Sequence, residues 1–356
     1  MSYQTDYRQS RSLLGAPHAV AVYGALVAAL LLLPFLLPTY YVGELSFIFI
    51  MCVASLGLMT LTGFTGQISL GQAAFVGIGA YLHAQLLTLG VPLPLAMASA
   101  AAGAALAGLL VGIPAIRVSG LHLAMVTLAF AIITEHVLGR WKSVTGGHSG
   151  IQVPDPSLFG WSLGSPRAFY FLCLAMLIMV LLLLLNLLRS ATGRAFVGIR
   201  DSEAASQGLG INVARTKVLA FALSAGTCGL AGALLAHQTQ YITPDAFGMA
   251  LSLQLVLMVF VGGMGSLRGA ILGAILIGLL PPLISQLKAF LPRGISGQFG
   301  LELFVYGAVL SFFVLLEPRG LNGRWIKLRN WLTRFPMVRA VSSHPTKVYM
   351  RSERYR

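Results

Sequence analysis

The polar side chains with the clearest potential for binding chemistry lie in a glycine-rich part of the sequence. Residues 63–72 read Gly-Phe-Thr-Gly-Gln-Ile-Ser-Leu-Gly-Gln, and three glycines at this spacing disfavour a continuous helix. Gln67, Ser69 and Gln72 could line a passage and hydrogen-bond the ammonium and carboxylate groups of a zwitterion, which loses bound water there. Close helix packing through the small residues of 71–80 explains the same glycines, and both interpretations stay open.

Ionisable side chains are rare within the apolar stretches of the chain. Those well inside them are His83, His122, Glu135 and His136, while Glu44 and Glu302 lie close to the outer ends of their stretches. Glu135 is the only acid among the first four, and it lies near one end of its stretch, where water would reach it. Carriers driven by protons or sodium usually need carboxylates near mid-membrane. The scarcity of acids therefore argues against that class.

Motifs for ATP binding and metal chemistry are missing from the sequence. No Gly-Lys dipeptide occurs, so there is no Walker A loop, and no His-Glu-x-x-His occurs either. Cys52, Cys173 and Cys228 lie in apolar stretches and are too few for a disulfide framework or a zinc site. We therefore predict that this polypeptide is not an enzyme and holds no metal and no cofactor.

The composition indicates whether water or lipid surrounds this protein. Of the 356 residues, 57% are hydrophobic and only 10% are charged, and 40 are glycines. Soluble domains carry about 25% charged residues, and a water-soluble globule cannot hide so much apolar surface. The sequence therefore predicts an all-α polytopic membrane protein and excludes a soluble enzyme, a disordered protein and a secreted disulfide scaffold.

Apolar segments of suitable length predict about ten transmembrane or re-entrant helices, since a bilayer core needs about 20 apolar residues per helix. Eight full crossings with re-entrant segments would satisfy the same pattern, with 68–89 and 247–262 as the segments least suited to a full crossing. The ten segments are 17–37, 41–62, 68–89, 92–113, 120–139, 168–188, 217–236, 247–262, 269–290 and 300–316.

The distribution of charge predicts the orientation of these helices. The chain has 24 Lys and Arg against 10 Asp and Glu, a net charge of +14. With both termini in the cytoplasm, the outer side keeps only Arg140, Lys142, Arg167, Lys288 and Arg293. This is the bias of the positive-inside rule, so the basic balance indicates membrane lipid and no nucleic acid.

Three parts follow from this topology. Residues 1–16 form a cytoplasmic N-terminal segment, 17–316 a transmembrane domain with a cytoplasmic loop at 189–216, and 317–356 a basic cytoplasmic tail. The first apolar segment is too long for a signal-peptide core, and it is interpreted as a retained helix. Within the tail, residues 323–335 alternate apolar and basic side chains at helical spacing, which predicts an amphipathic helix at the membrane surface.

The cytoplasmic loop is polar but is patterned for a short helix. Asp201 or Ser202 could cap that helix, and Glu203 places an acid in its first turn, where the helix dipole favours it. Gly210 is placed to end it. Such a helix, built on small residues, can lie tightly against another protein; a solvated connector is the alternative.

Six stretches of the chain, in order, resemble the signatures of one transporter family. The loop resembles the EAA loop of ABC importer permeases, in the form found in the LivM-type branched-chain amino-acid permease family. The matching stretches are Thr62–Tyr81, Arg117–Phe130, Trp141–Ile151, Gly193–Asn212, Gly262–Ala274 and Glu317–Leu321.

The resemblance implies the transmembrane permease subunit of an ATP-driven ABC importer in a bacterial inner membrane, which moves branched-chain or other hydrophobic amino acids inward. Glu203, Ala204, Ala205 and Gly210 would belong to the coupling helix that docks into an ATPase subunit. The implied partners are two cytoplasmic ABC ATPases, a second related permease and an extracytoplasmic solute-binding protein.

Two departures from the family pattern affect the expected solute. Ala131-Ile132 and Ser149 stand where relatives often carry acidic or other polar residues. Import of urea, a short amide or an aromatic acid therefore stays an alternative. A secondary carrier or a channel is the rival from another class, and the EAA-like loop and the scarce carboxylates speak against it.

Overall fold

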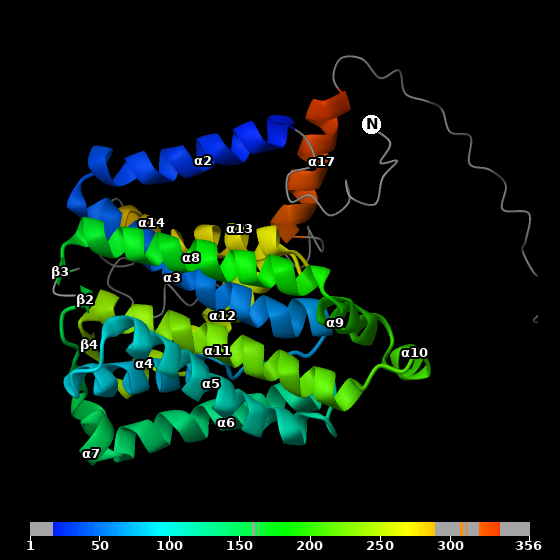
Figure 1. Cartoon of the computed structure of the whole chain (residues 1–356), viewed down its shortest axis with the longest axis horizontal. Coiled ribbons are helices and arrows are strands. Elements are labelled where there is room, and N and C mark those ends of the chain that lie inside the picture. The colour runs from blue at the N-terminus through cyan, green and yellow to red at the C-terminus, as the bar shows by residue number, and fades with distance from the viewer. Residues whose placement is uncertain are drawn as a thin grey trace, which may run out of the picture.

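The computed structural model describes residues 17–158, 161–162, 164–288, 307–308, 311 and 320–334. The described residues form a helical bundle whose long helices run side by side (Figure 1). The longer helices are α2 (Pro17–Leu36), α3 (Thr39–Leu58), α4 (Gln72–Thr88), α5 (Leu93–Ala115), α6 (Leu121–Arg140), α8 (Pro166–Arg189) and α11 (Val213–Thr239). The shorter helices are α7 (Lys142–Thr145), α9 (Ala191–Asp201), α10 (Glu203–Gly208), α12 (Met249–Gly262), α13 (Leu267–Gly278), α14 (Leu280–Lys288) and α17 (Gly320–Arg334).

Other regular elements are short. A π-helical turn (Met59–Gly63) continues α3, and 3₁₀ turns cover Gly147–Ser149 and Pro244–Phe247. Strand β1 (Ile151–Gln152) pairs antiparallel with β4 (Tyr241–Ile242), with Ile151 opposite Ile242. Strand β2 (Ser157–Leu158) pairs with β3 (Trp161–Ser162) in a hairpin. Both strand pairs lie at the end of the bundle away from α9 and α10 (Figure 1).

Seven helical segments of the described residues are long and apolar enough to cross a membrane. They are Thr39–Gly63, Leu93–Ala115, Leu121–Arg140, Pro166–Arg189, Val213–Thr239, Pro244–Gly262 and Leu267–Ile284. Each coincides with one of the apolar segments predicted from the sequence, and the class of all-α polytopic membrane protein is confirmed. The predicted first segment is helical as α2, whose described apolar part, Gly24–Leu36, is shorter.

The structure differs from a set of ten uniform helices at two places, and a third predicted segment is not tested by it. Segment 68–89 becomes helical only at Gln72, because non-helical backbone occupies its first residues. Segment 269–290 is divided at Leu279 into α13 and α14. Segment 300–316 lies almost wholly outside the described residues.

The centre of the bundle is formed by α3 and α11, which other helices surround. In the apolar part of the span that contains α3, 89% of the residues are buried. In that of α8 only 28% are buried, and leucines are exposed along its outer face. Small residues allow the central helices to approach closely. A methyl group on Gly232 of α11 would collide with the main-chain oxygen of Val76 in α4. Backbone approach of this kind is a common way for helices to associate in lipid.

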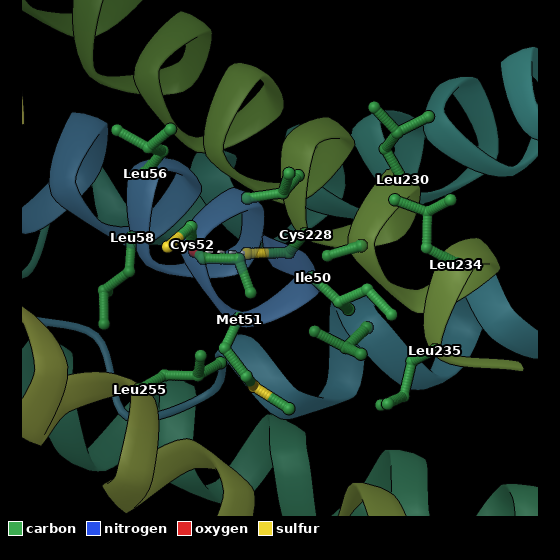
Figure 2. Packing of buried hydrophobic residues seen from close by; sticks show 14 of the residues in the cluster. Ile50, Met51, Cys52, Leu56, Leu58, Cys228, Leu230, Leu234, Leu235 and Leu255 are labelled. Atoms are coloured by element: carbon green, nitrogen blue, oxygen red, sulfur yellow. Dashed lines mark hydrogen bonds between the residues drawn. The ribbon is translucent and has the colours of Figure 1, made fainter. Parts of the chain in front are cut away.

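Apolar side chains close the middle of this core. Figure 2 shows Ile50 and Met51 of α3, Leu235 of α11 and Leu255 of α12 in one packed group. Together with Ala54, Val76, Ala231 and Leu251 they surround a narrow gap that leaves no room for a water molecule. We call these eight residues the apolar seal.

Helix α17 lies at the same end of the bundle as α9 and α10 and runs across the direction of the long helices (Figure 1). Its first residue, Gly320, packs against the turn after α12: a methyl group on Gly320 would lie 2.6 Å from the amide nitrogen of Gly263. The predicted helix at 323–335 is therefore present over Gly320–Arg334. Trp325, Ile326 and Leu328 are exposed on it, which suits a helix at a membrane surface.

Candidate functional site

The glycine-rich stretch after α3 contains the break that its sequence predicts. Helical backbone ends at Thr65, and residues 66–71 are non-helical before α4 begins at Gln72. Gly66 has φ +71°, a left-handed conformation that side chains other than glycine rarely adopt. Non-helical backbone inside a membrane protein persists only where protein or a water-filled cavity satisfies its polar groups. We call residues 66–71 the broken segment.

Hydroxyl groups from distant helices satisfy the main chain of the broken segment. Thr127 of α6 accepts a hydrogen bond from the Leu70 amide at 3.0 Å, and Ser252 of α12 accepts one from the Ala73 amide at 3.1 Å. Ser69 accepts one from the Gly71 amide at 3.3 Å. The amides of Gly71 and Ala73, on either side of the first residue of α4, are thus paired within the protein.

The Gln72 side chain forms hydrogen bonds that join the start of α4 to α11. Its side chain is fully buried, and its Nε2 donates to the Ser69 hydroxyl at 3.4 Å. Its Oε1 accepts hydrogen bonds from the Ser224 hydroxyl at 3.3 Å and the Cys228 thiol at 3.2 Å, both on α11. Ser69 and Gln72 therefore have partners that make the packing interpretation sufficient for them.

Gln67 differs from the two neighbouring polar residues. Its side chain is only 5% exposed, yet neither atom of its amide has a hydrogen-bond partner among the described residues. Its main chain is held, because its amide donates to the Leu61 oxygen at 3.3 Å and its oxygen accepts from the Thr62 hydroxyl at 3.1 Å. A buried unpaired amide costs on the order of 1–3 kcal/mol. A ligand that paired with it would recover that energy.

The loop between α8 and α11 folds into two helices that project from one end of the bundle (Figure 1). Ser202 is the residue that caps α10, because its hydroxyl accepts from the Ala205 amide at 3.2 Å. Gly210 has φ +81° and follows the helix, as its position in the sequence predicts. The capped short helix is therefore present over Glu203–Gly208.

Glu203 anchors α10 to the bundle. Its carboxylate lies 2.7 Å from the ammonium of Lys217 at the start of α11, and the Lys217 side chain is only 4% exposed. The Glu203 side chain is itself half exposed, but removing it would leave the buried Lys217 charge without this partner, which is destabilising. The pair therefore fixes where α10 begins.

The exposed side of α10 carries small and apolar residues beside the polar Gln207, although it lies beyond the long helices. Ala204 and Ala205 are exposed, while Ser206 is buried against the bundle. Leu209, just after the helix, is 82% exposed. The predicted residues Glu203, Ala204, Ala205 and Gly210 are thus brought together in one projecting element, with Glu203 as its inner anchor.

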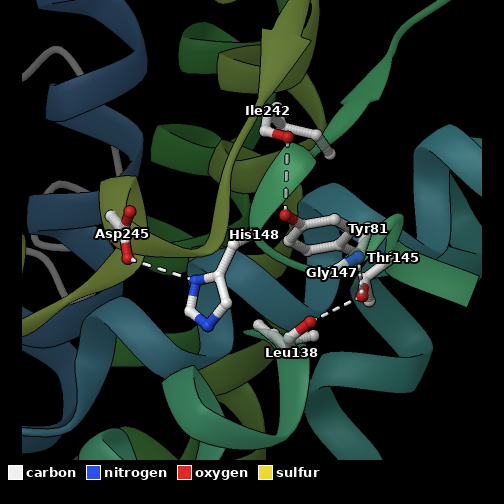
Figure 3. Close-up of polar contacts among 7 residues, drawn as sticks. All are labelled: Tyr81, Leu138, Thr145, Gly147, His148, Ile242 and Asp245. Atoms are coloured by element: carbon white, nitrogen blue, oxygen red, sulfur yellow. Dashed lines mark hydrogen bonds and ion pairs between the residues drawn. The ribbon is translucent and has the colours of Figure 1, made fainter. Parts of the chain in front are cut away.

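The opposite end of the bundle holds the Thr-Gly-Gly loop. The Thr145 hydroxyl donates to the Leu138 oxygen at 2.5 Å and accepts from the Gly147 amide at 3.2 Å, as Figure 3 shows. Tyr81 donates to the Ile242 oxygen at 3.4 Å, which ties α4 to β4. His148 and Asp245 lie 4.0 Å apart, but both side chains are largely exposed, so this pair contributes little to stability.

Several polar residues at these places are not apparent from the sequence. Thr127, Ser252 and Lys217 carry no local motif, because each acts on a segment far away in the chain. The same is true of His237, whose Nε2 lies 2.8 Å from that of His83 inside the bundle. Within the described ranges, no group of three or more His, Cys, Asp or Glu side chains is placed to hold a metal ion.

Comparison with known proteins identifies the class to which this architecture belongs. The sequence model of the family described as "Branched-chain amino acid transport system / permease component" matches residues 40–314. That range contains the broken segment, the apolar seal and both loop helices. The chain therefore belongs to this family of ABC transporter permeases, whose members are transport proteins of the inner membrane.

Individual relatives support the same class. The chain is 32% identical over 312 residues to the high-affinity branched-chain amino acid permease LivM of Escherichia coli, covering 80% of this chain and 69% of that protein. It is 28% identical over 312 residues to a probable branched-chain amino acid permease, LivH, of Methanocaldococcus jannaschii (82% and 94% coverage).

A further relative transports a different solute. The chain is 31% identical over 272 residues to the autoinducer 2 import permease LsrC of Klebsiella pneumoniae, covering 72% of this chain and 75% of that protein. No solved structure matches the chain.

Proposed function

We propose that this permease imports hydrophobic amino acids, with branched-chain amino acids as the favoured substrates. Support comes from similarity to LivM over 80% of the chain, together with the apolar seal in the middle of the bundle. An aliphatic side chain would replace contacts among Ile50, Met51, Leu235 and Leu255 as it passes. The zwitterionic part of the same solute needs polar partners, and Gln67 offers an unpaired amide.

The proposed orientation places α9, α10 and both chain termini in the cytoplasm. The α9–α10 end carries Arg189, Arg194, Arg200, Arg215 and Arg268, and α17 adds further basic residues at that end. Positive charge collects on the cytoplasmic side of membrane proteins. The broken segment is then at the cytoplasmic end of the path, and the Thr-Gly-Gly loop faces the side from which a binding protein would deliver substrate. Ten crossings remain the proposed count, with segment 300–316 as the tenth.

In the proposed assembly, two ABC ATPases hydrolyse ATP, a second related permease completes the membrane part, and a solute-binding protein supplies the substrate. The observation that carries this proposal is α10, which is capped by Ser202, anchored by the Glu203–Lys217 pair and exposes Ala204, Ala205 and Leu209. Exposed apolar side chains that lie outside lipid mark surfaces for another protein. We propose that closure of the ATPases moves α10, and that this movement separates the helices around the apolar seal.

The test is ATP-driven uptake by the complex reconstituted with its ATPases, second permease and binding protein. Uptake of labelled leucine, isoleucine and valine is measured against urea, short amides, aromatic acids and autoinducer 2. We expect uptake of the branched-chain amino acids. This uptake should occur only when ATP is supplied on the side of the vesicle membrane where α10 lies. Uptake of one of the other solutes instead would reassign the substrate, and uptake without ATP would reject the importer.

A further inference from the structure

Arg200 extends from the end of α9 into the bundle and contacts the backbone at the end of the α3 π-helical turn. Its Nη1 donates to the main-chain oxygen of Gly63 at 3.0 Å. Its Nε and Nη2 both donate to Oδ1 of Asp201 at 3.3 Å, so the neighbouring carboxylate orients the guanidinium. The last carbonyl groups of a helix lack intrahelical partners and carry partial negative charge, which makes a cation there favourable.

Two glycines with left-handed backbones surround this side chain. A methyl group on Gly66 would lie 3.1 Å from Cγ of Arg200, and a methyl group on Gly265 would lie 2.6 Å from its Nη1. Gly66 has φ +71° and Gly265 has φ +79°. Gly66 belongs to the broken segment, and Gly265 belongs to the turn between α12 and α13. The arginine therefore occupies the point where the two glycine-rich segments meet.

The two segments also touch each other at this point. A methyl group on Gly63 would lie 3.0 Å from the amide nitrogen of Gly265. On the other side, α9 is joined to α10, since a methyl group on Gly198 would lie 3.1 Å from the Ser206 hydroxyl. Phe196 and Ile199 of α9 are buried as well. Arg200 is thus connected to α10 through the packed body of α9.

We propose that Arg200 is the positioning residue that links α9 and α10 to the broken segment and to the α12–α13 turn. Through its hydrogen bond to Gly63 and its contacts with Gly66 and Gly265, movement at the ATPase surface reaches the cytoplasmic end of the path. This inference deepens the proposed ATP-driven import and rests on it.

The first test compares two arginines of α9 in the reconstituted complex. Arg200→Gln keeps a polar side chain but removes the charged contact with Gly63. Arg194→Gln removes an arginine whose side chain, among the residues that the structure describes, donates locally to the Arg189 oxygen. The readout is solute imported per ATP hydrolysed, which an effect on assembly alone would not change. We expect about a tenfold fall for Arg200→Gln, the effect of losing one charge-assisted hydrogen bond. Arg194→Gln should match the wild type, and Arg200→Lys should recover part of the loss.

The second test replaces the contact by a covalent bond. A Cβ atom on Gly66 would lie 3.7 Å from Cβ of Arg200, within the usual disulfide separation of about 3.5–4.5 Å. Cys52, Cys173 and Cys228 are buried and would not compete for the oxidant. In the Gly66→Cys/Arg200→Cys variant we expect weak coupling when reduced and recovered coupling when oxidised, because the disulfide again joins α9 to the broken segment. The Gly66→Cys variant alone measures any effect of backbone strain.

Each outcome of these tests supports or overturns the proposal. An equal ratio of solute to ATP in wild type and Arg200→Gln would overturn it, as would a disulfide that abolishes transport, since α9 and the broken segment would then have to separate. Failure of the two cysteines to cross-link in the assembled complex would contradict the contact itself. A wild-type complex without ATP-driven uptake would instead reject the proposed function, so the two failures are distinguishable.

Discussion

The two glycine-rich segments of this permease differ in what their glycines accomplish. In the α12–α13 hairpin they bring backbones together: a methyl group on Gly273 would collide with the Met258 oxygen, and one on Gly262 with the Gly269 oxygen. Ser266 caps α13 by accepting from the Gly269 amide at 3.1 Å. In the broken segment, Gly71 also lies against the Thr127 backbone, but Gly66 has a left-handed conformation outside helical geometry, and Gln67 beside it is buried without a side-chain partner.

This difference shows that glycine content alone does not identify a transport path. Both segments lie at the same end of the bundle and both contact Arg200, but only the first combines irregular backbone with an unpaired buried amide. The hairpin is explained by packing. The broken segment carries an energetic cost that packing does not explain, and we interpret that cost as a sign of function.

The largest expected effect comes from filling the hairpin contact. Gly273→Val should prevent α13 from approaching α12, because its side chain would occupy the space of the Met258 oxygen. Overpacking costs about 1–3 kcal/mol or more, so the yield of folded protein and its thermal unfolding temperature in detergent should both fall. Gly24→Val is the control, since a side chain there meets no atom within 4 Å. Equal stability of the two variants would contradict the packing role.

The next effect separates function from folding in the broken segment. Gln67→Ala should lower uptake about tenfold, because the substrate loses one polar partner in a dry passage. The folded yield should not fall, since the removed amide has no partner among the described residues. Uptake and unfolding are measured on the same preparation, and a loss of stability without a loss of uptake would reverse the interpretation.

Gln72→Ala should lower stability and have a smaller effect on uptake, which is the reverse of what we expect for Gln67→Ala. It removes the acceptor for Ser224 and Cys228, which should lower the free energy of unfolding by about 1–3 kcal/mol. Thermal unfolding in detergent measures this change. If Gln72→Ala reduced uptake as strongly as Gln67→Ala while stability stayed unchanged, both glutamines would have to line the path.

Labelling of introduced cysteines sharpens the comparison further. Ser69 is fully buried, so a cysteine at Ser69 should react with a small water-soluble thiol reagent only in nucleotide states that open the path. A cysteine at Met264, which is 54% exposed in the hairpin turn, should react in every state and serves as the reference. If the cysteine at position 69 never reacts, packing would explain the broken segment as it explains the hairpin.

The smallest expected effect concerns α17, which packs on the hairpin through Gly320. A peptide of residues 320–334 should be unstructured in buffer and become helical on anionic vesicles, but hardly on neutral ones. Each cation near an anionic leaflet contributes about 1 kcal/mol, and the tryptophans suit the headgroup region. Circular dichroism measures the helicity; equal values on both kinds of vesicle would remove the electrostatic argument.

Local signals predicted much of the fold. Length and apolar composition located the helices that can cross a membrane, since burial in lipid is a property of each segment alone. Glycine spacing predicted the break before α4, and a capping pattern predicted α10. The division of 269–290 at Leu279 was not predicted, although the sequence carries a local signal for it: Pro281 and Pro282 follow directly and have no amide with which to continue the hydrogen bonds of α13.

The sequence by itself thus determined the membrane class, most helices, the broken segment and the short helix α10, because each depends on neighbouring residues. Only the tertiary structure decided which polar side chains are free. Gln72 is paired by α11, the Leu70 amide of the broken segment by Thr127, the Ala73 amide of α4 by Ser252, and Glu203 by Lys217. Hydrogen-bond satisfaction depends on partners brought from distant segments, so no local pattern could distinguish Gln67 from Gln72.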